Sequence, residues 1–258
     1  MFHIDSENEL WHGGALTFVD PSGADLAPPD TVRLYALAAT EHSPSGGNGT
    51  PPICRVRESN SIDYRPIERA LLLALDGWAT RNEEPPASTY PMVADATLVA
   101  PQEVNFPAIP GVEYAGTVSR RYVVDFGTVP PGRGEGYPVL APQVDEDGNM
   151  LAGIRHPWIS APLATHTGWN LRPEGMGGKD LCMIYGMRIP FAPDPITREG
   201  DGDPRLSVAE RYASEEHYLE QVRAAALDLV SRGYLLAEDV DRIVEEGRNR
   251  YRVTTGVE

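Results

Sequence analysis

The chain has 258 residues, 41% of them hydrophobic, which is ordinary for a soluble globular protein with one large or two small domains. Its net charge of −16 argues against nucleic acid and anionic membrane surfaces as partners, since the long-range field repels both. No apolar run approaches the roughly 18–20 residues of a membrane span, and no signal region opens the chain, so the default expectation is a cytoplasmic location.

Two strand-like runs open the chain, and each ends on polar residues. Residues 1–5 (MFHID) stop on the acidic segment 6–9 (SENE), and residues 32–38 (VRLYALA) alternate like a buried strand and lead to His42. We expect these strands to pair in parallel. In α/β hydrolases the acid follows one strand and the histidine follows the last, after a serine on an earlier G-x-S-x-G elbow. No G-x-S-x-G occurs here.

A helix is predicted over residues 67–79, where one apolar stripe recurs at helical spacing: Ile67, Ala70, Leu71, Ala74, Leu75 and Trp78. Asp63 is the expected N-cap, and Pro66 suits the first turn, where its missing N–H is harmless. We expect this helix to pack on the two strands.

Residues 83–145 read as irregular structure with short strands, in which 130–136 is an exposed loop. Residues 137–144 and 150–154 predict a hairpin with 145–149 (DEDGN) as its turn. This acidic run weakly resembles a calcium loop but lacks the distal glutamate and the twelve-residue frame, which favours a solvated turn.

The end of the chain is predicted to be helical. Residues 198–204 (REGDGDP) read as a linker, and Ser207 with Glu210 makes a capping-box pattern. Ser214 marks a second helix start, and apolar residues from Val240 onward give a last helix.

Neither a cofactor nor a metal is expected. His156, His166 and His217 have no partner at a metal-ligand spacing, and the motifs H-E-x-x-H and C-x-x-C are absent. The only cysteines, Cys54 and Cys182, lie far apart in the sequence. We expect two unrelated buried thiols, with one structural disulfide as the less favoured alternative.

The chain resembles the bacterial alpha/beta hydrolase domain-containing family over nearly its whole length. The similar segments are 5–11 (DSENELW), 17–23 (TFVDPSG), 32–35 (VRLY) with 40–42 (TEH), 63–66 (DYRP), 138–145 (PVLAPQVD), 162–170 (PLATHTGWN) and the acidic helical end after 202–205 (GDPR). Family members are longer, and this chain looks like their C-terminal half. A truncated or split gene would explain a chain that starts on a core strand.

The resemblance implies an α/β fold in three parts. Residues 1–82 would be the C-terminal part of an α/β-hydrolase core, with short parallel strands plus a helix. Residues 83–197 would be an irregular, family-specific region with a β-hairpin, and residues 198–258 a helical C-terminal tail. If the rest of the sheet is absent, we expect some strand side chains of the core to be left partly exposed, namely Phe2, Ile4, Leu34, Tyr35 and Leu37.

The resemblance also implies the candidate catalytic residues His42, as the general base, and Glu9, as the acid. The family's segment places its carboxylate directly before an aromatic pair, which matches Glu9 before Leu10-Trp11. Glu7 and Asp5 are the alternative acids. The competing interpretation is that His42 is an exposed loop histidine and that the carboxylates only solvate a strand end. If the pair is real, the carboxylate should reach Nδ1 of the imidazole, and the other ring nitrogen should face a cavity or solvent.

No nucleophile is identified. Ser119 lacks the elbow context, Ser43 and Ser45 are too near His42 in sequence, and neither cysteine has a nucleophilic setting. The function expected from the family is therefore that of the C-terminal portion of a serine-esterase-like hydrolase, inactive alone, whose intact form cleaves a small-molecule ester. The alternative is a non-catalytic remnant or interaction module, in which a partner chain or a second copy covers the exposed core strands.

Overall fold

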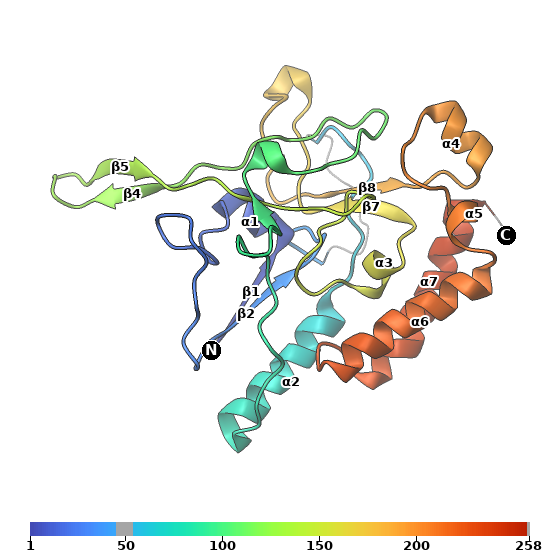
Figure 1. Cartoon of the computed structure of the whole chain (residues 1–258), viewed down its shortest axis with the longest axis horizontal. Coiled ribbons are helices and arrows are strands. Elements are labelled where there is room, and N and C mark those ends of the chain that lie inside the picture. Colours follow the sequence, from blue (N-terminus) through green and yellow to red (C-terminus); the bar gives the residue numbers. More distant parts are fainter. Residues whose placement is uncertain (45–53, 257–258) are drawn as a thin grey trace.

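The computed structural model describes residues 1–44 and 54–256, which form a mixed α/β structure of helices and small sheets (Figure 1). The strands β1 (Phe2–Ser6) and β2 (Arg33–Leu37) pair in parallel, as expected. Short parallel bridges from Thr89 and Ile154 add to the far side of β2, so β2 is central. No described segment pairs with the other edge of β1.

The predicted helix is α2 (Arg65–Arg81), with Pro66 in its first turn. Its N-cap is Tyr64 rather than Asp63, whose Oδ1 instead accepts the backbone N–H of Arg65 at 3.2 Å. Ile67 and Leu71 of α2 are buried in the same cluster as Tyr35 and Leu37 of β2, and the ring of Trp78 lies 5.8 Å from that of Phe2. The helix therefore covers one face of the parallel strands.

The middle of the chain holds short elements: β3 (Leu98–Val99), η1 (Pro101–Glu103), β4 (Tyr122–Asp125), β5 (Gly132–Gly136), β6 (Ala141–Pro142), α3 (Pro157–Ser160), β7 (Ala164–Thr167), η2 (Glu174–Met176) and β8 (Met187–Pro190). The exposed loop expected at 130–136 is wrong, because 132–136 is β5, which pairs with β4 in a hairpin that projects from the body (Figure 1). Its G-R-G-E-G sequence carries no strand pattern, and pairing with β4 supplies the order.

The hairpin expected around 145–149 is only partly present. Its strands meet at the single bridge Val144–Met150, and β6 pairs with β3 instead. The turn itself is confirmed, because Oδ1 of Asp145 accepts the backbone N–H groups of Asp147 at 3.1 Å and Asn149 at 2.9 Å.

The end of the chain is helical: α4 (Pro195–Asp201), α5 (Val208–Arg211), α6 (Glu215–Ser231), η3 (Ala237–Asp239) and α7 (Val240–Thr255). The linker expected at 198–204 is wrong, since α4 occupies most of it. Asp194 caps α4 by accepting the N–H of Thr197 at 2.9 Å, and Gly202 ends it in the left-handed conformation. The capping box of Ser207 and the N-cap of Ser214 are confirmed.

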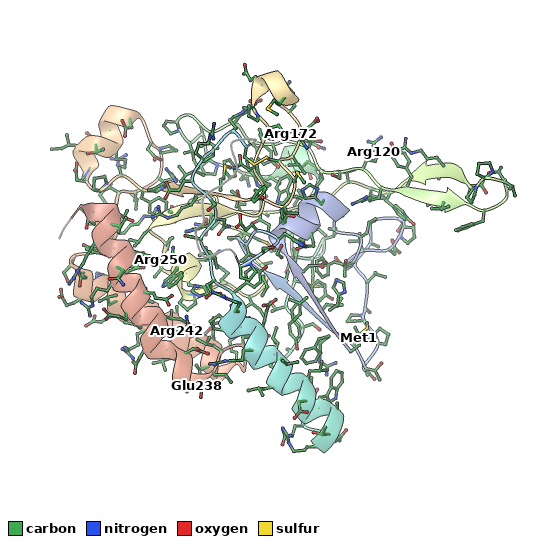
Figure 2. The ribbon with its side chains drawn as sticks, turned by 180° about the vertical axis from the view of Figure 1, so that it is seen from behind. Met1, Arg120, Arg172, Glu238, Arg242 and Arg250 are labelled. Atoms are coloured by element: carbon green, nitrogen blue, oxygen red, sulfur yellow. A yellow bond between two sulfur atoms is a disulfide. The ribbon has the colours of Figure 1, made fainter. Side chains whose placement is uncertain are left out.

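Helices α6 and α7 lie side by side and pack against the body of the molecule (Figure 1). Seen from behind, Met1 and Arg120 lie toward the side from which the β4–β5 hairpin projects, and Arg242 of α7 lies on the opposite side (Figure 2). Within the described ranges, no helix has the length and apolar character needed to cross a membrane.

One large buried cluster joins all parts of the chain. It contains Tyr35 and Leu37 of β2, Ile154 from the middle, and Val222 of α6. The division into three parts at residues 82 and 197 stays a prediction. From the sequence, we expect Leu34, Tyr35 and Leu37 of β2 to be partly exposed. This expectation is wrong, because elements of this chain bury all three residues. Of the residues expected to be partly exposed, Phe2 and Ile4 of β1 are half-buried.

The cysteines form a disulfide, so the expectation of two unrelated thiols is wrong. Cys54 and Cys182 have an S–S distance of 2.06 Å and a Cα–Cα distance of 5.6 Å. The fold brings a loop that follows β2 beside the segment that precedes β8, and this proximity cannot be read from the separation in sequence.

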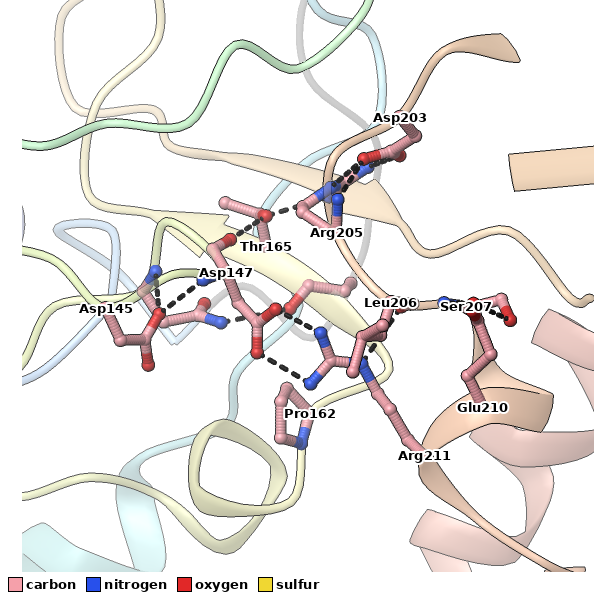
Figure 3. Close-up of polar contacts among 12 residues, drawn as sticks. Asp145, Asp147, Pro162, Thr165, Asp203, Arg205, Leu206, Ser207, Glu210 and Arg211 are labelled. Carbon is pink, nitrogen blue, oxygen red and sulfur yellow. Dashed lines mark hydrogen bonds and ion pairs between the residues drawn. The ribbon is translucent and has the colours of Figure 1, made fainter. Parts of the chain in front are cut away.

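A polar network fastens the helical end to the body (Figure 3). The buried guanidinium of Arg205 donates to both carboxylate oxygens of Asp203, at 2.9 and 2.5 Å, and to Oγ1 of Thr165 in β7 at 2.8 Å. Arg211 of α5 donates to Asp147 of the acidic turn at 2.9 Å. These contacts hold α5 and its flanking segment against β7.

We expect Arg205→Ala to lower the free energy of unfolding by roughly 3–5 kcal/mol, because it leaves the buried carboxylate of Asp203 without its cation. Urea unfolding followed by circular dichroism measures the change. The matched control is Arg223→Ala, whose partner Asp241 is 88% exposed, and which should cost about 0.5 kcal/mol or less. Equal costs for the two variants would contradict this account of the network.

Candidate active site

The acid candidate Glu9 lies in the first turn of α1 (Glu7–Gly13), a helix that follows β1 without a loop. Ser6 is the N-cap, and its Oγ accepts the N–H of Asn8 at 3.2 Å. In return, Oε2 of Glu9 accepts the backbone N–H of Ser6 at 2.8 Å and also its hydroxyl. This capping box fixes the carboxylate at the positive end of the helix. The Ser-x-x-Glu signal for it was present in the sequence and was missed.

The base candidate His42 lies just beyond the carboxyl end of β2. Its backbone N–H donates to the carbonyl of Ile184 at 3.3 Å, and its carbonyl accepts the phenol of Tyr64 at 2.7 Å. Burial raises the pKa of Tyr64, so its hydroxyl stays a neutral donor. Two hydrogen bonds, one at its N–H and one at its carbonyl, thus fix the backbone of His42.

Glu9 and His42 are in contact. Nδ1 of His42 donates to Oε1 of Glu9, and the side chains are 53% and 32% exposed, respectively. Among the described residues, no group forms a hydrogen bond with Nε2. The expected contact is therefore present, and this ring nitrogen is left for a further group. The catalytic roles of the two residues stay a prediction.

The two alternative acids bond other partners. Oδ1 of Asp5 accepts Nε2 of His3 at 2.9 Å. Burial raises the pKa of Asp5, and the neighbouring imidazole of His3 opposes the shift. Glu7 points into the interior, where Oε1 accepts the indole N–H of Trp11 at 2.8 Å. Neither carboxylate is bonded to His42.

Glu7 is a buried acid behind the site. Burial raises its pKa to about 7, against the opposing effect of the Trp11 indole and the backbone N–H groups of Gly168 and Ala39. It stands where α1, the end of β2 and the segment after β7 meet, so its protonation affects how these three elements pack.

The segment 166–170 (HTGWN) packs against α1, the helix that carries Glu9. Gly168 lies so close to α1 that a Cβ there would be 2.5 Å from the backbone N of Asn8, and the side chain of Asn8 donates to the Gly168 carbonyl at 2.6 Å. The ring of Trp169 is buried 5.5 Å from that of Trp11. Its observed contacts are therefore those of a packing element beneath α1, and it does not line the cavity.

A cavity of about 510 Å³ opens beside the pair. Its wall is largely apolar, with Leu10, Ala15, Leu16, Met183 and Ile184, and Arg121 lies at its rim. Among the described residues, the lining includes no serine or cysteine, and its threonine, Thr17, lies near Asp5 and lowers the pKa of that carboxyl. The site therefore combines an acid–base pair with an apolar pocket, and its described part presents no serine nucleophile.

Of the other serines considered, Ser43 directly follows His42, and the backbone of Ser119 donates to Trp11. Ser45 lies outside the described residues. The described ranges also contain no set of three or more histidine, cysteine or acidic side chains arranged to hold a metal. His156 and His166 are core residues, and burial lowers the pKa of His156 to about 3.

We expect Ser6→Ala to loosen the Glu9 carboxylate, because it removes the hydroxyl that bonds Oε2 and caps α1 and leaves only the backbone N–H of residue 6. The free energy of unfolding should fall by about 1 kcal/mol, and the hydrogen-bonded Nδ1–H signal of His42 should broaden in proton NMR. Ser207→Ala is the control, since it breaks the equivalent capping box of α5. A broadened His42 signal in both variants, or in neither, would contradict the assignment.

Stability should depend on pH through Glu7. The pKa of Glu7 is about 7 in the folded chain, against the ordinary value of 4.5. Between these two pH values the folded chain binds more protons than the unfolded chain, so the free energy of unfolding falls as the pH rises through this range. Glu7→Gln removes this titration, which is on the order of 3 kcal/mol. Urea midpoints at about pH 5 and about pH 8 measure it. The control Glu84→Gln, at an 84% exposed side chain, should keep the slope of the native protein. An unchanged slope in Glu7→Gln would show that Glu7 does not titrate there.

Comparison with known protein families identifies the family to which the chain belongs. A family model described as an alpha/beta hydrolase domain matches residues 1–245. No curated protein and no solved structure matches the chain. The match covers nearly the whole chain, and the chain therefore belongs to the alpha/beta hydrolase domain family.

Proposed function

We propose that this chain supplies the acid and the general base of a serine-esterase-like hydrolase, with Glu9 and His42 in these roles. The observation that carries the proposal is the bond from Nδ1 of His42 to Glu9, with Nε2 bonded to no described residue and a largely apolar cavity beside it. Family membership supports hydrolase chemistry, and the cavity suits a neutral small-molecule ester.

In this proposal, Glu9 keeps the proton of the neutral imidazole on Nδ1, so the lone pair of Nε2 is free. Nε2 then takes the proton of a nucleophilic hydroxyl as its oxygen attacks the ester carbonyl. Glu9 stabilises the imidazolium that forms, and His42 returns the proton to the leaving alcohol. The capping box suits this role, because it holds the carboxylate while its charge is needed.

We propose further that a polypeptide segment other than the described residues brings the nucleophile, and that the chain alone is inactive. The open edge of β1 supports this. Arg33 donates its N–H to Met1 across the pair, so the alternate residues Phe2 and Ile4 direct their backbone polar groups away from β2. A parallel strand added there would end on the same side as Glu9. The chain would then act as the C-terminal portion of a larger hydrolase.

The second candidate function is a non-catalytic interaction module. Two leucines of α2 favour it, since Leu72 and Leu73 are 65% and 53% exposed, and no described segment pairs with the outer edge of β1. In that case a partner would cover these surfaces without adding a nucleophile.

The test compares the chain alone with a form extended by the in-frame coding sequence upstream of Met1, or by a co-purifying polypeptide, in p-nitrophenyl acetate hydrolysis. The chain alone should show background hydrolysis and no labelling by a fluorophosphonate. The completed form should turn over substrate, and His42→Ala should reduce kcat by roughly 10³-fold or more.

Arg223→Ala, on α6 and away from the cavity lining, is the control that should keep most of the activity. Turnover by the chain alone would mean that it contains its own nucleophile. A completed form whose activity survives His42→Ala would exclude the proposed role. A completed form without any turnover would favour the interaction module.

A further inference from the structure

Residues 182–186, which we call the strap, contact both the helix that carries the acid and the histidine itself. The carbonyl of Ile184 accepts the backbone N–H of His42 at 3.3 Å. The carbonyl of Met183 accepts the side-chain amide of Asn8 at 3.3 Å and also bonds Nε2 of His12. One short segment thus fixes α1 and His42 relative to each other.

The centre of the strap is exposed, so burial contributes little to holding it in place. Met183 and Ile184, at its centre, are 49% and 40% exposed and form part of the cavity wall. Met183 also adopts a φ of +51°, a left-handed conformation that costs energy for a residue with a side chain. A strained and half-exposed segment keeps its shape only when both of its ends are fixed.

Both ends are fixed, and the first end is fixed covalently. Cys182 forms the disulfide with Cys54, with both sulfur-bearing residues buried, and its N–H donates to Asn170 at 2.7 Å. At the other end, the N–H of Gly186 donates to Glu41 at 2.9 Å. A Cβ at Gly186 would lie 2.0 Å from the Thr167 carbonyl, so the backbone is held against β7.

We propose that the disulfide between Cys54 and Cys182 is a positioning element for the Glu9–His42 pair, acting through the strap. Without it, the strap relaxes from its strained shape, the carbonyls of Met183 and Ile184 move, and the imidazole loses its fixed distance to Glu9. The catalytic meaning of this positioning rests on the proposed function. The geometric effect does not, since it concerns a contact that exists in the chain alone.

The test is the Nδ1–H signal of His42 in protein labelled with ¹⁵N-histidine, assigned by its loss in His42→Asn. In the double variant Cys54→Ala/Cys182→Ala, we expect its exchange with solvent to rise about tenfold or more, because local opening becomes easier. The matched control is Val222→Ala, in the buried face of α6, which destabilises the fold without touching the strap. Signals that change equally in both variants would overturn the proposal, as would an unchanged signal in the double variant.

A second variant keeps the proposal testable if the double variant does not fold. His12→Phe keeps a ring at the half-buried position 12 but loses the bond to the Met183 carbonyl, and it leaves the disulfide intact. It should increase the same exchange rate in the same direction, by a smaller factor. No change in His12→Phe would then overturn the proposal. These readouts need no turnover, so they can support the positioning role of the disulfide even if the esterase assay fails. Equally, the esterase assay can succeed when these readouts contradict the positioning role.

Discussion

The carboxylate of Glu9 serves two structures at once, and the rest of the site depends on this. One oxygen closes the capping box with Ser6, which allows α1 to begin at the last residue of β1. The other oxygen meets Nδ1 of His42. A glutamate with a free side chain would lose rotamer entropy on meeting the imidazole. Here the helix start has already removed that freedom, so the pair forms between groups that are in place.

This arrangement requires α1 to lie very close to the backbone behind it. Gly168 permits the approach, since any side chain there would collide with Glu7 and Asn8. The same closeness buries Glu7 and raises its pKa to about 7, which is unfavourable for the charged form. The fold therefore places two adjacent carboxylates in opposite surroundings, with Glu7 desolvated and Glu9 half-exposed at the rim of a cavity. Packing thus turns Glu7 into the interior, and Glu9 is the carboxylate that bonds His42.

The sequence was sufficient where the signals are local. The two N-terminal strands, the helix around Leu71 and the helix starts at Ser207 and Ser214 follow from periodicity and capping residues, and all are present. Helices α1 and α4 carry comparable local signals, Ser6 with Glu9 and Asp194-Pro195 with Gly202, which were missed because short helices have little apolar periodicity.

Non-local features could not be predicted in this way. The strand Gly132–Gly136 contains three glycines and is ordered by its partner rather than by its own residues. The disulfide needs two segments 128 residues apart to be adjacent, which is a property of the tertiary fold. The contact between Glu9 and His42 was predicted from the resemblance and the strand geometry together. The resemblance supplied the two residues, and neighbouring parallel strands bring their carboxyl ends to one edge of the sheet.

The location of the nucleophile is constrained by the same geometry. His42 has Glu9 at Nδ1, the carbonyl of Ile184 at its backbone N–H and the phenol of Tyr64 at its carbonyl. Only Nε2 is left, so a hydroxyl that exchanges a proton with this residue must approach there. The far side of β2 is already occupied by the bridges from Thr89 and Ile154, whereas β1 has no described neighbour on its outer edge. Under the proposed function, a strand that brings the nucleophile would therefore add beside β1, where no described segment pairs.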